Sequence, residues 1–264
     1  MSQGNYLPHL FKLADAVSAA VRSCEDHSYL GEYTGMGADG TPTKRIDAVA
    51  EGCVLELLDK LNLPLNVLSE EAGFVDRGHE ETLVLDPIDG TYNALHGIPF
   101  YSVSLAVGEK CLSDIHTALV RDLVHGSTYW AERGKGAYLD GKQIATLQTE
   151  REDTLFSVML SRRASSQSFK IGALPKRTRN LGSAALEMCM VADGTFEVYY
   201  NAIPGGSLRI TDIAAASLIL REAGGEVFND RYEILEMVFD VRERKNVIAM
   251  GNRRYAEILQ KIRR

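Results

Sequence analysis

The segment 83–91 limits most strongly what this chain can fold into, because an apolar strand runs directly into a turn that carries two acids. The run LVL at 83–85 is typical of a buried strand. It continues at once into DPIDGT at 86–91, where the proline and the glycine favour a tight turn. Such a turn brings the carboxylates of Asp86 and Asp89 to one point, and their oxygens suit a hard cation such as Mg²⁺. A simple turn is the alternative, although a turn needs only one aspartate.

The amides that follow the two aspartates add a second kind of binding site. Gly90 and Thr91 open a short helix that is expected through residues 92–96. The first amides of a helix lack intrahelical partners, and together with the helix dipole they form a cradle for a phosphate. The segment therefore predicts that a metal ion and an anion meet at the end of this strand.

Four further acids are candidates for the same site, and each also has an ordinary structural explanation. An apolar strand delivers Glu70 and Glu71 to its carboxyl end, where open α/β sheets bind ligands, and an exposed acidic loop is the alternative. Asp212 stands directly before an apolar helical stripe, so helix N-capping also explains it. Asp47 lies inside a helical pattern, where a solvated helix face is the alternative.

Apolar periodicity predicts helices near both ends of the chain and short strands between them. The expected helices are 7–24, 45–61, 183–192, a helix that starts near Ile213 and stops at Gly224-Gly225, and 253–264. The expected strands are 65–68, 82–85, 102–107, 115–120, 127–130, 155–160, 196–200 and 247–250. The helix 45–61 has the apolar stripe Ile46, Val49, Cys53, Val54, Leu57 and Leu58. A glycine-rich loop is expected at 35–43, and Asp140-Gly141 marks a hairpin.

This mixture of elements, without an internal repeat or a linker, predicts an α+β layered sandwich of two interlocked halves. The division falls near residue 145. The half 1–145 carries most of the candidate metal ligands, and the half 146–264 completes the substrate site.

Composition excludes several classes of function. The net charge of -7, from 29 Lys and Arg against 36 Asp and Glu, disfavours nucleic acid as a partner. No apolar run approaches the roughly 18 residues of a membrane helix, and the N-terminus lacks the order of a signal peptide, so a cytoplasmic protein without a membrane partner is expected. The 4 cysteines and 6 histidines are scattered, which favours reduced thiols and gives zinc chemistry no support.

Three motifs, in the right order, make the chain resemble the inositol monophosphatase superfamily, the Mg²⁺-dependent, lithium-sensitive phosphatases that include fructose-1,6-bisphosphatases. The motifs are SEEAG at 69–73, DPIDGTYN at 86–93 and TDIAAASLILREAGG at 211–225. GADGTPTKRIDAVAE at 37–51 and KRTRNLGSAALE at 176–187 further resemble an archaeal branch that acts on both inositol phosphates and fructose 1,6-bisphosphate. Thr211 departs from the tryptophan of many members. The resemblance implies a layered αβαβα sandwich and a homodimer.

The resemblance also implies roles for individual residues. With two or three Mg²⁺ ions bound, the implied metal ligands are Glu70, Asp86, the Ile88 carbonyl, Asp89 and Asp212, and a third, weaker ion would sit near Asp47 and Glu70. Thr91, helped by Glu70 or Asp47, would orient or deprotonate the attacking water. The implied substrate contacts are Asp89, Gly90, Thr91, Arg179, Ser183, Ala184 and Asp212. Phosphate monoester hydrolysis by metal-activated water needs no covalent intermediate.

A basic segment in this acidic chain is a candidate site for a second phosphate. It comprises Arg162, Arg163, Lys170, Lys176, Arg177 and Arg179, around a serine-rich loop. A solvated basic loop is the alternative. The position of Arg179 just before Gly182-Ser183-Ala184 favours the phosphate site, because in the resembled family that stretch borders the far side of the substrate.

Competing functions remain open at the level of the sequence. A haloacid-dehalogenase-type phosphatase uses an aspartate nucleophile in D-x-D-G-T, whereas the motif here is one residue longer. Adenosine 3',5'-bisphosphate and NADP are alternative substrates within the resembled superfamily. A non-catalytic, phosphate-sensing relative is the alternative from another class.

Overall fold

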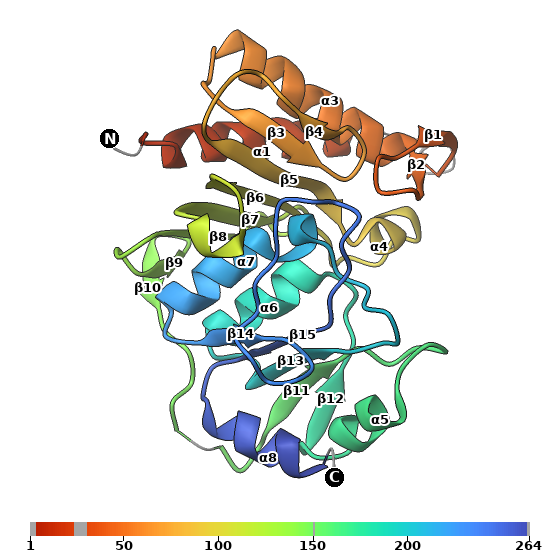
Figure 1. Cartoon of the computed structure of the whole chain (residues 1–264), viewed down its shortest axis with the longest axis vertical. Coiled ribbons are helices and arrows are strands. Elements are labelled where there is room, and N and C mark those ends of the chain that lie inside the picture. Colours follow the sequence, from red (N-terminus) through yellow and green to blue (C-terminus); the bar gives the residue numbers. More distant parts are fainter. Residues whose placement is uncertain (1–3, 24–30, 150, 263–264) are drawn as a thin grey trace.

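The computed structural model describes residues 4–23, 31–149 and 151–262, and in this part of the chain helices and sheets alternate in five layers (Figure 1). The first layer holds α1 (Leu7–Ser23) and α3 (Arg45–Lys60), which pack on one face of the larger sheet. The expected α+β sandwich is confirmed. Cys24 and residues 263–264, which end two expected helices, lie outside the described residues.

The second layer is an eight-stranded sheet with the order β10-β9-β8-β7-β6-β5-β3-β4. Its strands are β3 (Asn66–Ser69), β4 (Gly73–Val75), β5 (Thr82–Asp89), β6 (Ser102–Gly108), β7 (Thr117–Asp122), β8 (Thr128–Glu132), β9 (Ala137–Leu139) and β10 (Lys142–Ile144). β3 and β5 are parallel, and the other neighbours are antiparallel. A short 3₁₀ turn, η1 (Leu112–Asp114), precedes β7, and the hairpin predicted at Asp140-Gly141 joins β9 to β10.

The middle layer consists of α6 (Ala184–Ala192) and α7 (Ile210–Glu222), which lie between the two sheets (Figure 1). Both helices are buried along nearly their whole length, as expected for helices that are covered on two faces. They carry much of the largest apolar core, together with residues of both sheets. Because these helices of the second half pack on the sheet of the first, the halves interlock; the division at residue 145 itself stays a prediction.

The fourth layer is a five-stranded sheet with the order β12-β11-β13-β15-β14. Its strands are β11 (Leu155–Val158), β12 (Arg177–Arg179), β13 (Val198–Asn201), β14 (Glu226–Phe228) and β15 (Val247–Met250). The fifth layer, α5 (Ser166–Gly172) and α8 (Arg254–Ile262), covers its outer face and buries Ile171 and Leu259. None of the helices in the described ranges combines the length and the apolar composition needed to cross a bilayer.

Several local expectations are wrong. The glycine-rich stretch 35–43 is part of a hairpin formed by β1 (Tyr33–Met36) and β2 (Pro42–Lys44), which lies beside α3 and α4 (Thr91–Leu95) in Figure 1. The serine-rich loop contains α5 and leads into β12. Val49 is 39% exposed, so it lies outside the buried stripe of α3.

The turn predicted at Asp86–Asp89 is instead a β-bulge within β5. Asp86 pairs with Ser104 and Asp89 with Ser102, so two residues of β5 stand opposite one residue of β6. Side chains three positions apart fall on opposite faces of a regular strand, and the extra residue restores both aspartates to one face. Pro87 fits this position because a bulge does not need its missing amide.

Candidate active site

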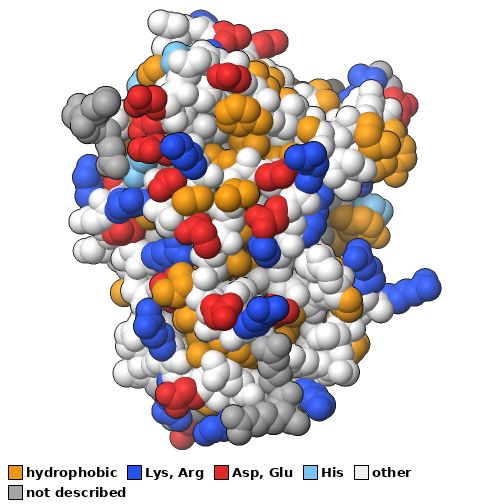
Figure 2. All heavy atoms as spheres, in the orientation of Figure 1, with side chains coloured by type: hydrophobic (Ala, Val, Ile, Leu, Met, Phe, Trp, Pro, Cys, Tyr) orange, Lys and Arg blue, Asp and Glu red, His pale blue; other side chains and the backbone are white. Residues whose placement is uncertain are grey.

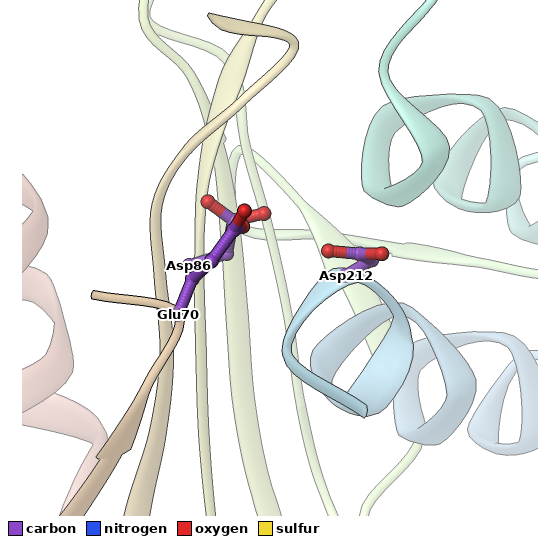
Figure 3. A group of neighbouring side chains, drawn as sticks. All are labelled: Glu70, Asp86 and Asp212. Atoms are coloured by element: carbon purple, nitrogen blue, oxygen red, sulfur yellow. The ribbon is translucent and has the colours of Figure 1, made fainter. Parts of the chain in front are cut away.

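The carboxylates of Glu70, Asp86 and Asp212 converge from three separate elements (Figure 3). Glu70 follows β3, Asp86 lies on β5 before the bulge, and Asp212 is in the first turn of α7. One oxygen of each lies within 4.8 Å of the others. Asp86 and Asp212 are buried and the Glu70 side chain is 20% exposed, so neither a simple turn at Asp86 nor an exposed acidic loop at Glu70 explains these residues. We call Glu70, Asp86 and Asp212 the acid cluster.

The surroundings of the acid cluster penalise negative charge. Burial, followed by the charge of Asp89, holds the pKa of Asp86 well above its ordinary value. Burial also raises the pKa of Glu70, and the charge of Asp212 adds to the rise. A bound cation would offset the repulsion among negative charges this close together in a buried site. Carboxylate oxygens are the ligands that the hard cations Mg²⁺ and Ca²⁺ prefer.

Asp212 is not the N-cap of α7, so this alternative from the sequence is wrong. α7 begins at Ile210, and Asp212 is its third residue. Its Oδ2 accepts a hydrogen bond of 2.7 Å from the amide of Arg209. Asp212 therefore stabilises the start of α7 and still presents a carboxylate to the acid cluster.

Thr91 connects Asp47 to the bulge of β5. Its hydroxyl lies 3.0 Å from Asp47 Oδ1 and 3.0 Å from the Ile88 carbonyl, either of which can accept its single proton. Asp47 is 7% exposed and so does not lie on a solvated helix face. Burial raises the pKa of Asp47 to about 7, against the opposing effect of the Thr91 hydroxyl. A carboxyl group with this pKa can accept a proton near neutral pH.

Gly90 ends the bulge and begins α4, as the sequence predicts. Its φ of 96° is in the left-handed region, and a Cβ there would lie 3.1 Å from Tyr101 Cβ and 3.2 Å from the carbonyl of Gly182. Asn93 fixes the other end of the turn by donating to the carbonyls of Phe100, at 2.8 Å, and Leu181, at 2.7 Å. Gly90 thus joins the end of β5 directly to α4.

Asp89 lies beside the acid cluster and is held from the second half of the chain. Its Oδ2 accepts hydrogen bonds from the Ser183 hydroxyl at 2.5 Å and from the amide of Ala185 at 2.7 Å. Burial and the charge of Asp212 raise its pKa, while these donors oppose the rise. The stretch that includes Ser183 and Ala184 therefore contacts Asp89, and its role in substrate binding stays a prediction.

Arg209 is a residue of the site that the sequence interpretation missed. Its guanidinium pairs with Asp39 of the β1–β2 hairpin, lies 2.8 Å from Glu70 Oε1, and is 3.7 Å from Asp212 Oδ1. Arg244 joins it at 2.9 Å from Asp39 Oδ2. The Asp39 side chain is fully buried, and hydrogen bonds and the arginines lower its pKa despite burial. The two arginines thus fasten the hairpin to the second half.

Glu51 and Glu71 also lie at the site, although neither belongs to the acid cluster. Glu51, one helical turn after Asp47, accepts hydrogen bonds from the Ser69 hydroxyl at 2.6 Å and the amide of Ala72 at 3.2 Å. Glu71 accepts a hydrogen bond from the Thr43 hydroxyl. The spacing of Asp47 and Glu51, four residues apart on one helix, was the available signal for Glu51.

The basic side chains of 162–179 are exposed, and two of them are already paired. Lys176 and Arg177 form ion pairs with Asp153. Arg179 donates to the carbonyl of Thr178, and the next residue, Asn180, lines a cavity of about 130 Å³ that Asp89 also lines. Basic and acidic side chains are interspersed over the face shown in Figure 2. Arg179 thus remains the member nearest to the site along the chain.

Comparison with known proteins identifies the class that this fold and acid cluster define, the metal-dependent phosphatases. The model described as inositol monophosphatase family matches residues 3–264. The chain belongs to the inositol monophosphatase family and is a phosphatase, which confirms the resemblance seen in the sequence.

Individual relatives agree with this assignment. The chain is 36% identical over 254 residues to the fructose-1,6-bisphosphatase/inositol-1-monophosphatase of Methanothermobacter thermautotrophicus, over 91% of this chain and 90% of the relative. It is 35% identical over 240 residues to a bifunctional NADP phosphatase/NAD kinase of Methanococcus maripaludis, over 82% of this chain and 42% of the relative. A crystal structure of an inositol monophosphatase-fructose 1,6 bisphosphatase matches with a TM-score of 0.84 at 27% identity, over 99% of this chain and 100% of that one.

Proposed function

We propose that the protein hydrolyses inositol 1-phosphate, fructose 1,6-bisphosphate or both, with Mg²⁺ as the metal. The observation that carries the proposal is the convergence of Glu70, Asp86 and Asp212 within 4.8 Å, next to Thr91 and the start of α4. The named activity of the relative from Methanothermobacter thermautotrophicus supports the choice of substrates.

The donor set fits two or three Mg²⁺ ions. The residues that would hold them are Glu70, Asp86, the Ile88 carbonyl, Asp89 and Asp212, with Asp47 and Glu70 near a third, weaker ion. Mg²⁺ held there would neutralise the phosphate oxygens and make the attacking water more acidic. All of these donors are oxygens, and the raised pKa values of Glu70 and Asp86 show that this site disfavours uncompensated negative charge.

The residues beside the acid cluster have complementary tasks. The Thr91 hydroxyl accepts a proton from the attacking water while it passes its own proton to Asp47, and Glu70 helps to orient that water. The Gly90 and Thr91 amides donate hydrogen bonds to the phosphate. Because the pKa of Asp47 is about 7, this carboxyl accepts the proton without a large free-energy penalty at neutral pH.

The polyol or sugar lies on the side of the second half. Asp89 and Asp212 accept hydrogen bonds from its hydroxyls, and the stretch with Ser183 and Ala184 forms the wall beside it. Arg179 binds the second phosphate of a bisphosphate, since its planar guanidinium matches phosphate oxygens.

A panel of four phosphates tests the substrate assignment. Phosphate release is measured from inositol 1-phosphate, fructose 1,6-bisphosphate, adenosine 3',5'-bisphosphate and NADP, with Mg²⁺ and again with a chelator. Turnover of either of the first two supports the proposal. NADP is the second candidate, because a named relative is an NADP phosphatase. Hydrolysis of only the nucleotides, or of none of the four, contradicts the assignment.

Three further properties are part of the proposal. Li⁺ inhibits turnover by occupying a Mg²⁺ position after phosphate binds, and indifference to high lithium concentrations would argue against it. The protein is a homodimer, which sedimentation tests directly. It acts in the cytoplasm on a small phosphorylated molecule, without nucleic acid or membrane as partners.

A further inference from the structure

Glu187, in the first turn of α6, is a buried carboxylate that the proposed mechanism does not use. The residue is 2% exposed. Its Oε1 accepts hydrogen bonds from the Ser157 hydroxyl and, at 2.9 Å, from the amide of Leu181. Its Oε2 accepts one of 3.2 Å from the amide of Gly182. A buried carboxylate is costly unless donors surround it, and two of these donors are consecutive amides of a single turn.

The same turn, residues 181–185, is bound to Asp89 on its other side. The Ser183 hydroxyl and the Ala185 amide both donate to Asp89 Oδ2, at 2.5 Å and 2.7 Å. The turn therefore lies between two buried carboxylates. Glu187 accepts hydrogen bonds from the first two amides of the turn, and Asp89 accepts hydrogen bonds from Ser183 and Ala185 farther along it.

We propose that Glu187 is a positioning residue that fixes the turn 181–185 against Asp89 and so sets the substrate-facing wall of the site. The cavity of about 130 Å³ is lined by Asp89, Gly182, Ala184 and Glu187 itself. A displacement of the turn changes the wall of this cavity and the orientation of Asp89 together. The inference rests on the proposed function for its kinetic test, but not for its binding test.

Glu187→Gln is the sharpest test, because it keeps the size of the side chain and removes one acceptor. The amide group of glutamine must face one of the backbone N–H donors of the turn, and two donors cannot bond to each other. The turn then loses one anchor and shifts relative to Asp89.

The chain offers a matched control in Glu222. This carboxylate accepts hydrogen bonds from the amides of Gly134, at 2.8 Å, and Gly136, at 2.9 Å, in another turn. Glu222→Gln therefore makes the same chemical change to the same kind of turn, at a residue that neither contacts nor lines the site. A purely structural role predicts that both variants lower Tm and change nothing else.

The expected result is specific to Glu187→Gln. Its KM for inositol 1-phosphate and its Kd for Mg²⁺, measured by calorimetry without substrate, both rise about tenfold, or about 1.4 kcal/mol, while Glu222→Gln matches the wild type. The KM for fructose 1,6-bisphosphate rises by the same factor, because the wall serves both substrates. Unchanged KM and Mg²⁺ affinity in a folded Glu187→Gln protein overturn the proposal.

Ser157→Ala covers the case in which Glu187→Gln does not fold. It removes one donor from Glu187 Oε1 and leaves both amide bonds, so we expect a smaller rise, about threefold, of both constants. No rise in this variant overturns the proposal. If the wild-type protein releases phosphate from none of the four compounds, the proposed function fails, and the Mg²⁺ calorimetry alone still decides the role of Glu187.

Discussion

The acid cluster and the basic segment carry opposite charges in opposite surroundings. Glu70, Asp86 and Asp212 come from three elements that the fold forces together, in a setting that resists their charge. The basic side chains of 162–179 are exposed, and Lys176 and Arg177 are balanced by Asp153. Burying like charges together lowers the stability of a fold, so a buried cluster of acids is itself evidence for a binding site. Exposed basic side chains carry no such cost, and a ligand bound to them is needed to assign them a function.

The largest expected effect is on the acidic side. Asp89→Asn keeps an oxygen that accepts from Ser183 and Ala185, so we expect the variant to fold, but it removes a charge that the proposed metal site uses. We expect a loss of kcat of about 100-fold or more, since metal stabilisation of the transition state is worth several kcal/mol. Phosphate release and Tm are measured beside Asp240→Asn, an exposed aspartate paired with Arg242. Full turnover in Asp89→Asn, or in chelator, contradicts the mechanism.

The second effect belongs to the basic side and depends on the substrate. A charge-assisted hydrogen bond is worth about 1.5 to 3 kcal/mol, so Arg179→Ala raises the KM for fructose 1,6-bisphosphate roughly 10- to 150-fold. The KM for inositol 1-phosphate barely changes. Arg162→Ala is the next candidate, and Arg177→Ala has a smaller effect because Asp153 already binds this side chain. Equal changes for both substrates, or none, would remove the second-phosphate site from the basic segment.

Substitution of Arg209 measures how much a largely buried cation contributes to stability, compared with an exposed one. Arg209 contacts Asp39 and Glu70 through Nη2 and Asp212 through Nη1. The single Nζ of a lysine cannot replace both nitrogens, so Arg209→Lys loses at least one of these charged contacts. We expect Tm to fall by several degrees, from a loss of about 1.5 to 3 kcal/mol. Arg242→Lys, at an exposed pair with Asp240, is the control and shifts Tm by about a degree or less. Equal shifts in both would mean that Arg209 does not fasten the hairpin.

The smallest effect is a pH dependence of stability in chelator. The pKa of Asp47 is raised to about 7 in the folded chain, from an ordinary value of 3.8. Between these values the unfolded chain releases this proton and the folded chain keeps it, so the contribution of Asp47 to stability is complete below pH 3.8 and is lost as pH rises to about 7. Asp47→Asn removes that contribution. Thermal melts of both proteins between pH 4 and 8 should therefore converge or cross, and parallel curves would contradict the assigned pKa.

Much of the fold was predictable because long helices and buried strands repeat their apolar residues regularly. β5, β6 and α7 follow from their patterns within a few residues. The missed strands have three or four residues: β1 is exposed throughout, and β12 carries two exposed arginines. Segments this short hold too few apolar residues to show a period, and their pairing partners fix them instead.

The candidate site was predictable where chemistry and sequence motif coincide, as at Asp86, Asp89 and Asp212. Arg209 and Glu187 were missed because their roles depend on partners far along the chain or on a turn. The guanidinium of Arg209 meets Asp39, 170 positions away. In the sequence, Arg209 stands three residues before Asp212, and Glu187 stands five residues after Gly182. Charged residues at such positions are common at the starts of helices, so they indicate helix capping as readily as a functional site.

Because of the bulge in β5, one group of this site, the main-chain carbonyl of Ile88, does not depend on the side chain at its position. The extra residue leaves the Ile88 carbonyl outside regular pairing with β6, where the Thr91 hydroxyl reaches it. Every amino acid at position 88 would supply the same oxygen. A one-residue deletion, in contrast, would leave two aspartates spaced by two, still on one face, but without the bulge that keeps this main-chain oxygen out of the ladder. During evolution an insertion or a deletion in β5 can therefore remove this oxygen from the site, whereas nearly every point mutation leaves it in place.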